Sequence, residues 1–292
     1  MSKSNHKYHS TLNDDKSIKI CHLTTVHPRY DVRIFQKECL SLAAEGFETH
    51  LIVADNKGDE NVSSVFIHDI GNTNGRLKRF VVSSYYCFKK AKSLNAELYH
   101  FHDPELLFVG LLLKLYRKKV IFDSHELTGR QIKTKYYIPK FLRTVIAFSF
   151  DLIEQLVCKT LDAVVVPQSY LMIPHFEKSC KKVEVIGNYV DLTECPNPTL
   201  HESLSSKKQI NLLYSGTISN DRGLANMLAI MERFDNRFKL ILAGGFTNEA
   251  ELHKAKQHPA WSKVEYKGFV DRDTLKQLYH ESDIGLILFN PV

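Results

Sequence analysis

The segment ELYHFHDPELLFVGLLLKLYRKKVIFDSHE, residues 97–126, decides the fold class. Its pattern predicts a strand over 97–103, a helix over 104–117 and a second strand over 119–126. Pro104 is favoured in the first turn of a helix, which indicates where the helix begins. Two strands that are joined by a helix form a parallel pair, so the segment predicts a β-α-β unit within a parallel α/β sheet.

The same alternation of strands and helices continues on both sides of this unit. Further helices are predicted at 31–45, 76–94 and 137–160, and Gly46 stands where the first of them needs a C-cap. Consecutive apolar residues in several strands indicate that helices cover both faces of the sheet. The predicted strands of this half of the chain are 18–26, 49–55, 65–70, 97–103, 119–126, 162–168 and 182–188.

Residues 191–208 (DLTECPNPTLHESLSSKK) interrupt the alternation, because they contain two prolines, three serines and no apolar period. Beyond them the pattern restarts, with strands at 210–216, 238–245, 264–270 and 283–289 and helices at 222–234, 248–257 and 272–281. We therefore expect two Rossmann-like domains, with ligands at the carboxyl ends of the strands and in a cleft between the halves. The predicted parts are a disordered leader over 1–17, a domain over 18–190, a linker over 191–208 and a second domain over 209–292.

The second domain is expected to be incomplete. It offers only about 85 residues, which is below the common size of a domain. The chain stops at residues 290–292, directly after a strand of the buried type, and no predicted helix follows to cover that strand. We therefore expect the chain to be truncated.

Composition excludes several classes of protein. Of the 292 residues, 43% are hydrophobic and 25% are charged, which excludes a disordered chain, a collagen-like repeat and a small disulfide scaffold. The net charge of +6 is too weak to indicate nucleic-acid binding, although it could assist at an anionic membrane surface or an acidic substrate. No apolar run reaches the ~18 residues of a membrane span and no signal peptide is recognisable, so a cytoplasmic location is expected. Six cysteines without a C-x-x-C pair indicate buried free thiols.

The stretch YSGTISNDRGL (214–224) follows the first strand of the C-terminal half. Gly216 lets a ligand approach the backbone closely, and the helix that begins near Arg222 offers free N–H groups to an anion. The Arg222 guanidinium can bind a diphosphate through two hydrogen bonds. Gly244 and Gly245 form a second open turn after the next strand. The alternative is that both turns are ordinary strand-to-helix connections.

Polar residues also follow two strands of the N-terminal half, in HFHDPEL (100–106) and FDSHE (122–126). His100 and His102 alternate onto the same face of their strand. A metal could bind there, but no third ligand has convincing spacing, and Asp103 can instead cap the helix that follows it. The side chains that could converge at these strand ends are His102, Asp103, His125 and Glu126.

Three other segments leave a structural and a functional interpretation open. In VHPRYDVRIF (26–35), Asp31 can cap the following helix while Arg33 reaches the site. Asp271 could hold a metal–diphosphate together with the acid two residues later, but a helix N-cap explains it fully. The segment KTKYYIPKFLRTVIAF (133–148) predicts either a core-facing helix with a solvated basic edge or a surface that docks on an anionic bilayer.

Taken together, four segments resemble the GT-B glycosyltransferases of family 4, which are retaining enzymes that move a sugar from a nucleotide sugar. VHPRYDVRIFQKECLSLAAEGF (26–47) is similar to the opening of the bacterial polysaccharide-assembly members. LYHFHDPELL (98–107), followed by VIFDSHE (120–126), is similar to their acceptor-side cleft motifs. YSGTISNDRGL (214–224) is similar to the first turn of their C-terminal domain, and VEYKGFVDRDTLKQLYHESDIGLILF (264–289) to the run before their donor-sugar motif.

The resemblance implies roles for individual residues. In the second domain, contacts to the donor diphosphate and its nucleotide are implied for Gly216, Arg222, Gly223, Gly245, Phe269 and Val270. In the first domain, the side chains implied at the reacting centre are His102, His125 and Asp103, with Arg33 and Glu126 on the acceptor side.

The resemblance also implies a reaction without a metal or a cofactor other than the nucleotide sugar. The donor diphosphate leaves, the acceptor hydroxyl attacks the same face, and the configuration is retained. Arg222 and helix N-termini would stabilise the charge on the leaving group. The implied acceptor is a saccharide, best guessed as lipid-linked at the inner membrane face during surface polysaccharide synthesis.

The sequence departs from the family pattern in three places. Thr217 stands where the family often has a basic residue, and residues 26–28 replace a glycine pair. The paired glutamates that hold the donor sugar in the family would follow the last residue of this chain, so we expect little or no transfer activity from residues 1–292.

Two other functions remain open at the level of sequence. A nucleotide-sugar 2-epimerase would use acid–base carboxylates in the cleft, such as Asp103, Glu105 and Glu126. A truncated, non-catalytic remnant or accessory subunit would instead bind a partner transferase through its uncovered sheet.

Overall fold

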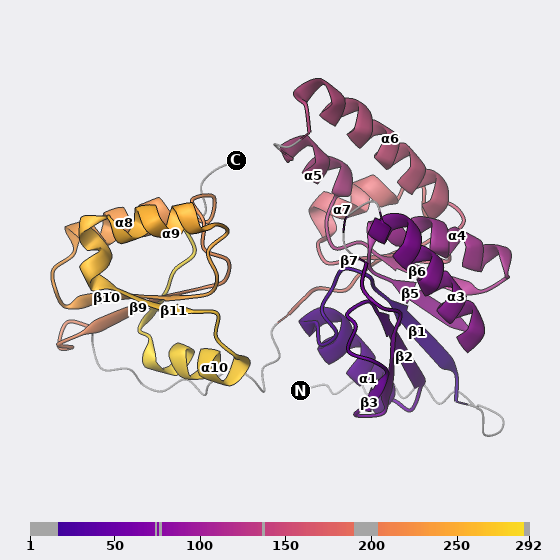
Figure 1. Cartoon of the computed structure of the whole chain (residues 1–292), viewed down its shortest axis with the longest axis horizontal. Coiled ribbons are helices and arrows are strands. Elements are labelled where there is room, and N and C mark those ends of the chain that lie inside the picture. The colour runs from indigo at the N-terminus through magenta and orange to yellow at the C-terminus, as the bar shows by residue number, and fades with distance from the viewer. Residues whose placement is uncertain (1–16, 74, 76–77, 136–137, 190–203, 289–292) are drawn as a thin grey trace, which may run out of the picture. The chain divides into compact units, whose positions relative to one another are not determined.

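The computed structural model describes residues 17–73, 75, 78–135, 138–189 and 204–288. The chain divides into two compact units, Met1–Asn188 and Tyr189–Val292, and each unit has its own sheet (Figure 1). The predicted leader lies outside the described residues except for Ser17, and the predicted linker is described only from residue 204 onward.

An eight-stranded sheet organises the first unit, in the order β3-β4-β2-β1-β5-β6-β7-β8. All neighbouring pairs are parallel except the antiparallel pair of β3 and β4. Each segment predicted as a strand contains one, whereas β3 was not predicted because three residues are too few to show a pattern. The strands are β1 (Lys19–Leu23), β2 (Glu48–Val53), β3 (Glu60–Val62), β4 (Val65–Asp69), β5 (Leu98–Phe101), β6 (Lys119–Asp123), β7 (Ala163–Val166) and β8 (Val183–Val185).

The helices of the first unit are less regular than the sequence predicted. The segment expected to be one helix over 31–45 begins as a π-helix, and a helix not predicted follows β7. The helix predicted over 137–160 starts later, directly after Pro139, which is its N-cap residue. The helices are η1 (Val32–Cys39), α1 (Leu40–Ala44), η2 (Arg79–Ser83), α3 (Ser84–Leu94), η3 (Pro104–Leu106), α4 (Leu107–Leu115), α5 (Thr128–Thr134), α6 (Lys140–Cys158) and α7 (Ser169–Phe176).

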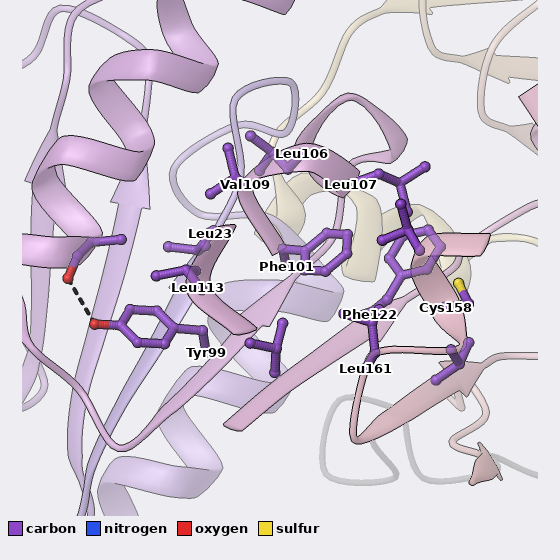
Figure 2. Close-up of a cluster of buried hydrophobic side chains, with 14 of the residues drawn as sticks. Leu23, Tyr99, Phe101, Leu106, Leu107, Val109, Leu113, Phe122, Cys158 and Leu161 are labelled. Atoms are coloured by element: carbon purple, nitrogen blue, oxygen red, sulfur yellow. Dashed lines mark hydrogen bonds between the residues drawn. The ribbon is translucent and has the colours of Figure 1, made fainter. Parts of the chain in front are cut away.

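The two faces of the central strands differ in chemistry. One face carries a hydrophobic core, in which Tyr99 and Phe101 of β5 and Phe122 of β6 pack against α3 and α4 (Figure 2). The Tyr99 hydroxyl donates a hydrogen bond of 2.7 Å to the carbonyl of Ala91, so its one polar atom is satisfied inside this core. The opposite face of the same strands is buried but polar, and it is there that η1 lies against the sheet.

A four-stranded parallel sheet, in the order β11-β10-β9-β12, organises the second unit. Helices α8 and α9 cover one face and α10 covers the other (Figure 1). All predicted elements of this unit are present, within a few residues of the predicted bounds. The unit also contains η5 (Pro259–Lys263), which was not predicted. The predicted elements are β9 (Ile210–Ser215), α8 (Leu224–Arg233), β10 (Phe238–Ala243), α9 (Glu249–Lys256), β11 (Val264–Gly268), α10 (Arg272–Glu281) and β12 (Ile284–Gly285).

The local signals for helix ends are confirmed in both units. Asp31 caps η1 by accepting hydrogen bonds from the backbone N–H groups of Arg33 and Ile34. Asp271 caps α10 in the same way, through the N–H of Thr274. Among the described helices, none is long and apolar enough to cross a bilayer.

Candidate active site

The first unit has a topological switch point between β1 and β5. From β1 the chain first builds the sheet outward through β2, and it returns to the other side of β1 with β5. Connections on the two sides therefore diverge at the carboxyl ends of β1 and β5, where α/β sheets bind their ligands. The loop after β1 (24–31), the loop after β5 and the loop after β6 all start at this edge.

Asp103, in the loop after β5, organises the loop after β1. Its carboxylate accepts hydrogen bonds from the backbone N–H groups of Thr25 and Val26 and from the hydroxyl groups of Thr24 and Thr25. The side chain is 1% exposed. Asp103 stands at the N-cap position of η3, but its side chain makes no capping hydrogen bond. The capping alternative is therefore wrong, and Asp103 instead holds the loop after β1 against β5.

Asp123, the last residue of β6, is the centre of the polar cluster at this edge. Its Oδ2 atom accepts a hydrogen bond of 2.7 Å from Arg33 Nε, and its Oδ1 atom accepts one of 3.0 Å from Arg33 Nη2. His102 Nδ1 and His125 Nε2 each lie 3.3 Å from Oδ2. A single buried carboxylate thus orients the arginine and both histidines.

The charges of this cluster are set by burial and pairing together. Burial alone would raise the pKa of Asp123, but its contacts with His102, His125 and Arg33 hold that pKa well below the usual range. Burial lowers the pKa of His102, so this imidazole is neutral near neutral pH. Burial also raises the pKa of Glu38, which faces the same cluster, to about 9.

Arg33 is fully engaged within the first unit. Its guanidinium is buried, and besides Asp123 it donates a hydrogen bond of 2.9 Å to the carbonyl of Ile186. Its Nε atom also lies 3.2 Å from Glu38 Oε1. The structure therefore places Arg33 beneath the edge of the sheet, as a group that holds Asp123 and the segment after β8.

Two of the predicted residues of this unit are open to solvent. The His125 side chain is 23% exposed, and its ring stacks at an angle on that of His27, with 4.9 Å between the centroids. His27 in turn lies 3.6 Å from Asp103 and 3.5 Å from Asp31, and these carboxylates raise its pKa although burial opposes the shift. Glu126 is exposed in the loop after β6. His125, His27 and Glu126 are thus the groups that a ligand at this edge would meet.

In the second unit, the loops after β9 and β10 are joined by backbone hydrogen bonds. The N–H of Gly216 donates to the carbonyl of Ala243, and the N–H of Ile218 donates to that of Gly245. Gly244 has a φ of 148°, and a Cβ atom at this position would lie 1.8 Å from the carbonyl oxygen of Gly216. Only glycine fits there, so the glycine turn after β10 serves first to let the two loops pack together.

These two loops expose backbone at Gly216 and Gly245 and a positive charge at Arg222. Gly216 is exposed, and a Cβ atom at Gly245 would meet no atom within 4 Å. Arg222 is exposed at the start of α8, one residue before Gly223. Gly223 is the N-cap residue of α8, with a φ of 82°, and a Cβ atom at this position would lie 1.5 Å from the carbonyl oxygen of Leu288. The arrangement places a cation beside a helix N-terminus at the carboxyl end of β9.

Phe269 and Val270 follow β11 and differ in exposure. The Phe269 side chain is 92% exposed, so it packs on no part of the described second unit. Val270 is half-buried and packs with Leu275 of α10 against Leu213 and Ile241. Phe269 is therefore available to stack on a planar ligand, whereas Val270 mainly anchors α10 to the sheet.

Two family models match the chain. The model described as Glycosyltransferase Family 4 matches residues 35–194, which is more than half of the chain. The chain belongs to glycosyltransferase family 4. A second model, Glycosyl transferases group 1, matches residues 197–288. Because the two models meet near the boundary between the two units, each compact unit of this family 4 glycosyltransferase corresponds to one of them.

Solved structures with the same fold are also glycosyltransferases. Sucrose-phosphate synthase from Thermosynechococcus elongatus matches 92% of this chain with 75% of its own, at a TM-score of 0.70 and 16% identity. WaaG, a glycosyltransferase involved in lipopolysaccharide biosynthesis, matches 92% with 74% of its chain, at a TM-score of 0.67 and 11% identity. HepE from Anabaena, in complex with UDP and glucose, matches 93% of this chain with 74% of its own, at a TM-score of 0.65 and 12% identity. No curated protein sequence matches the chain.

These matches confirm the GT-B fold that the resemblance implied, and the chain spans about three quarters of the length of the matched structures. They favour a glycosyltransferase over the 2-epimerase. The roles implied for individual residues stay predictions.

Three residues of the polar cluster were missed by the sequence analysis. Asp123 lay inside a quoted motif, and its position at the carboxyl end of a buried strand was the signal that could have singled it out. His22 lay in a strand that looked apolar. Glu38 could not have been found from a helical period of 3.6 residues, because the π-helix changes which side chains share a face.

Proposed function

We propose that this family 4 glycosyltransferase is a retaining enzyme that transfers a sugar from a nucleotide-sugar donor to a saccharide acceptor. The observation that carries the proposal is the pair of family matches, one on each unit. They support a division of labour in which one unit binds the acceptor and the other binds the donor.

The second unit is proposed to bind the donor. Gly216 exposes backbone at the carboxyl end of β9, and Arg222 adds a cation beside the N-terminus of α8. An arginine and free helix N–H groups are suited to a diphosphate. The exposed ring of Phe269 is suited to stack on a nucleotide base. The structure of HepE in complex with UDP and glucose supports a nucleoside diphosphate as the ligand class.

The first unit is proposed to bind the acceptor. His125 is the exposed member of the histidine pair on Asp123, so it can contact an acceptor hydroxyl while His102 supports it from below. Glu126 lies beside it in the same loop and can bind sugar hydroxyls. Since Arg222 and the N–H groups of α8 can stabilise the charge that develops on the leaving diphosphate, the reaction is proposed to require no metal and, as the resemblance implies, no protein nucleophile.

The acceptor is proposed to be lipid-linked, because the first unit exposes an apolar stripe. Phe141, Val145 and Phe148 recur at helical spacing along α6 and are 76%, 60% and 69% exposed. The core-facing interpretation of this segment is therefore wrong. Lys133 and Lys140 are exposed close by in the sequence, and apolar side chains flanked by lysines favour an anionic bilayer surface. The role of WaaG in lipopolysaccharide biosynthesis supports a surface saccharide pathway.

Nucleotide binding tests the donor assignment. UDP and ADP are titrated calorimetrically into residues 1–292 and into the Arg222→Ala variant. Because a charge-assisted hydrogen bond contributes about 1.5–3 kcal/mol, the variant is expected to bind about ten- to a hundred-fold more weakly. Arg237→Ala, an exposed arginine elsewhere in the same unit, is the control and should leave the affinity unchanged. Equal affinity of the Arg222 variant and the natural chain would refute the assignment.

Vesicle sedimentation tests the membrane assignment. Residues 1–292 should sediment with phosphatidylglycerol-containing vesicles, and the double variant Phe141→Ser, Phe148→Ser should stay in solution. Val81→Ser, which removes an exposed apolar side chain of η2, is the control. Sedimentation that is equal for the natural chain and the double variant would exclude α6 as the docking surface.

A further inference from the structure

Three histidines and a glutamate converge on the polar face of the first unit's sheet. His22 of β1 and His100 of β5 are partners in the register of the two strands, so their side chains lie next to each other. His102 follows two positions after His100 and returns to the same face. Glu38 faces them from η1. We call these four residues the histidine cluster.

The ligand atoms of the histidine cluster surround one point. His22 Nδ1 lies 3.0 Å from His102 Nε2. Glu38 Oε2 lies 3.7 Å from His22 Nδ1, 3.8 Å from His102 Nε2 and 3.9 Å from His100 Nδ1. Four ligands at about 2.0–2.1 Å from a tetrahedral ion stand roughly 3.3 Å apart. The four ligand atoms here all lie within 4.8 Å of one another, so the side chains would have to draw together around the ion.

The cluster also collects polar atoms that the described protein does not satisfy. Glu38 Oε2, one of the four atoms that face the common point, is buried and has no hydrogen-bond partner among the described residues. The Nε2 atoms of His22 and His100 are also unpaired, but they are the ring nitrogens opposite to the Nδ1 atoms that face Glu38. His22 is 0% and His100 8% exposed. Buried polar groups nearly always have partners, so the unpaired Glu38 Oε2 atom beside three buried imidazoles indicates a bound ion or water.

We propose that the histidine cluster binds one zinc ion in a closed, structural site, with His22 Nδ1, His100 Nδ1, His102 Nε2 and Glu38 Oε2 as its ligands. Imidazole and carboxylate together suit zinc better than magnesium or calcium, which prefer oxygen ligands. Four protein ligands leave no open position, which is typical of a structural rather than a catalytic site. The site contains none of the proposed donor-binding residues, and its one residue shared with the proposed acceptor site is His102, which lies behind His125.

The surroundings of His102 support this assignment. A histidine that ligates a metal usually directs its second ring nitrogen at a carboxylate, which fixes the tautomer and the ring orientation. His102 Nδ1 lies 3.3 Å from Asp123 Oδ2, so Asp123 would take this part. Zinc would then join β1, β5 and η1 directly beneath the loops of the candidate active site. Binding would displace the proton of Glu38 and leave all three imidazoles neutral.

Metal titration tests the proposal. Residues 1–292, freed of any affinity tag and treated with a chelator, are titrated with ZnCl2 by calorimetry and with CoCl2 by visible absorption. We expect one equivalent of zinc with a Kd below 1 µM, a rise in Tm on zinc addition, and a tetrahedral Co²⁺ spectrum. Glu38→Gln and His100→Gln should each weaken zinc binding at least ten- to a hundred-fold and alter the Co²⁺ spectrum.

His50→Gln is the matched control. His50 is buried and pairs with His68 at 2.9 Å, but its register partner is Cys21, so it lies on the opposite face of the sheet from His22. The control should bind zinc like the natural chain. Absence of stoichiometric binding, or binding that both cluster variants retain, would overturn the proposal. If circular dichroism shows that a cluster variant is unfolded, the Co²⁺ spectrum of the natural chain tests the site instead. A tetrahedral spectrum supports the proposal, and an octahedral spectrum counts against it.

Discussion

Arg33 Nε lies 3.2 Å from Glu38 Oε1, although five positions separate the two residues. In an α-helix, residues five positions apart point about 140° away from each other. The π-helix η1, which starts with a hydrogen bond from the Gln36 N–H to the Asp31 carbonyl, is wider and brings them onto one face. It thereby directs a cation and an acid at the same edge of the sheet.

The Arg33–Asp123 pair should be the most sensitive charge pair of the first unit. Asp123→Asn removes the carboxylate that accepts two hydrogen bonds from the buried guanidinium and leaves only Glu38, whose pKa is raised, as an acid beside it. We expect the free energy of unfolding to fall by about 3 kcal/mol. Urea denaturation monitored by circular dichroism measures the loss. Asp235→Asn, which breaks the exposed pair with Arg237, should leave the stability nearly unchanged. Similar losses in the two variants would show that burial does not set the strength of the Arg33–Asp123 pair.

Asp31 should make stability depend on pH. Burial opposes the shift, but His27 and two backbone N–H groups lower the pKa of Asp31 from 3.8 to about 2. A lowered pKa stabilises the fold above pH 4, and the stabilisation is lost as the pH falls from about 4 to about 2. Asn caps a helix as well as Asp, so Asp31→Asn removes only the charge, at a cost of about 2 kcal/mol near pH 7. Urea unfolding at pH 7 and pH 3 should show that the difference in the free energy of unfolding between the natural chain and the Asp31→Asn variant is smaller at pH 3. A difference that stays constant would contradict the assignment.

Asp103→Ala should release the loop after β1. The substitution leaves the N–H groups of Thr25 and Val26 without their acceptor, which should cost about 2–3 kcal/mol of stability. Hydrogen exchange should accelerate at these two amides while the amides of β5 stay protected. Asp271→Ala, which removes a surface helix cap in the other unit, should leave the loop's exchange rates as they are. Unchanged protection of Thr25 in the Asp103 variant would mean that other contacts hold the loop.

Gly223 and Gly268 provide a matched pair in the second unit. Both have positive φ, at 82° and 67°, so alanine is strained at either position. At Gly223 a Cβ atom would also lie 1.5 Å from the carbonyl oxygen of Leu288, whereas at Gly268 it would meet nothing within 4 Å. We expect Gly268→Ala to cost about 1 kcal/mol and Gly223→Ala about 3 kcal/mol or more. Equal Tm values of the two variants would show that the Leu288 backbone moves freely.

Most of the architecture could be predicted from the sequence, because local signals and tertiary packing agree. The unit formed by β5, α4 and β6 follows from its apolar runs and from Pro104. The caps of η1 and α10 follow from Asp31 and Asp271. In each case a short stretch of chain decides its own conformation, so no distant contact is needed to predict it.

The centre of the candidate site was harder to predict, because it depends on distant residues. Asp123 and Arg33 are 90 positions apart, and only the strand order brings them together. Glu38 joins them through a π-helix, for which no sequence pattern was available. On α6, the apolar side chains around Phe141 and Phe148 suggested a core, but no described part of the first unit covers them. Periodicity shows that a helix has an apolar face, and it does not show what that face meets.

The opposite chemistry of the two faces of β5 has a consequence for folding. Tyr99 and Phe101 face the hydrophobic core, whereas His100 and His102 face the polar side. If β5 slipped by a single residue along β1, the aromatic rings would enter the polar side and the imidazoles would enter the hydrophobic core. Both exchanges are unfavourable, so a sheet with the shifted register would be less stable for two separate reasons. The alternation therefore favours the native register of the two central strands over a shifted one while the chain folds, before any substrate is bound.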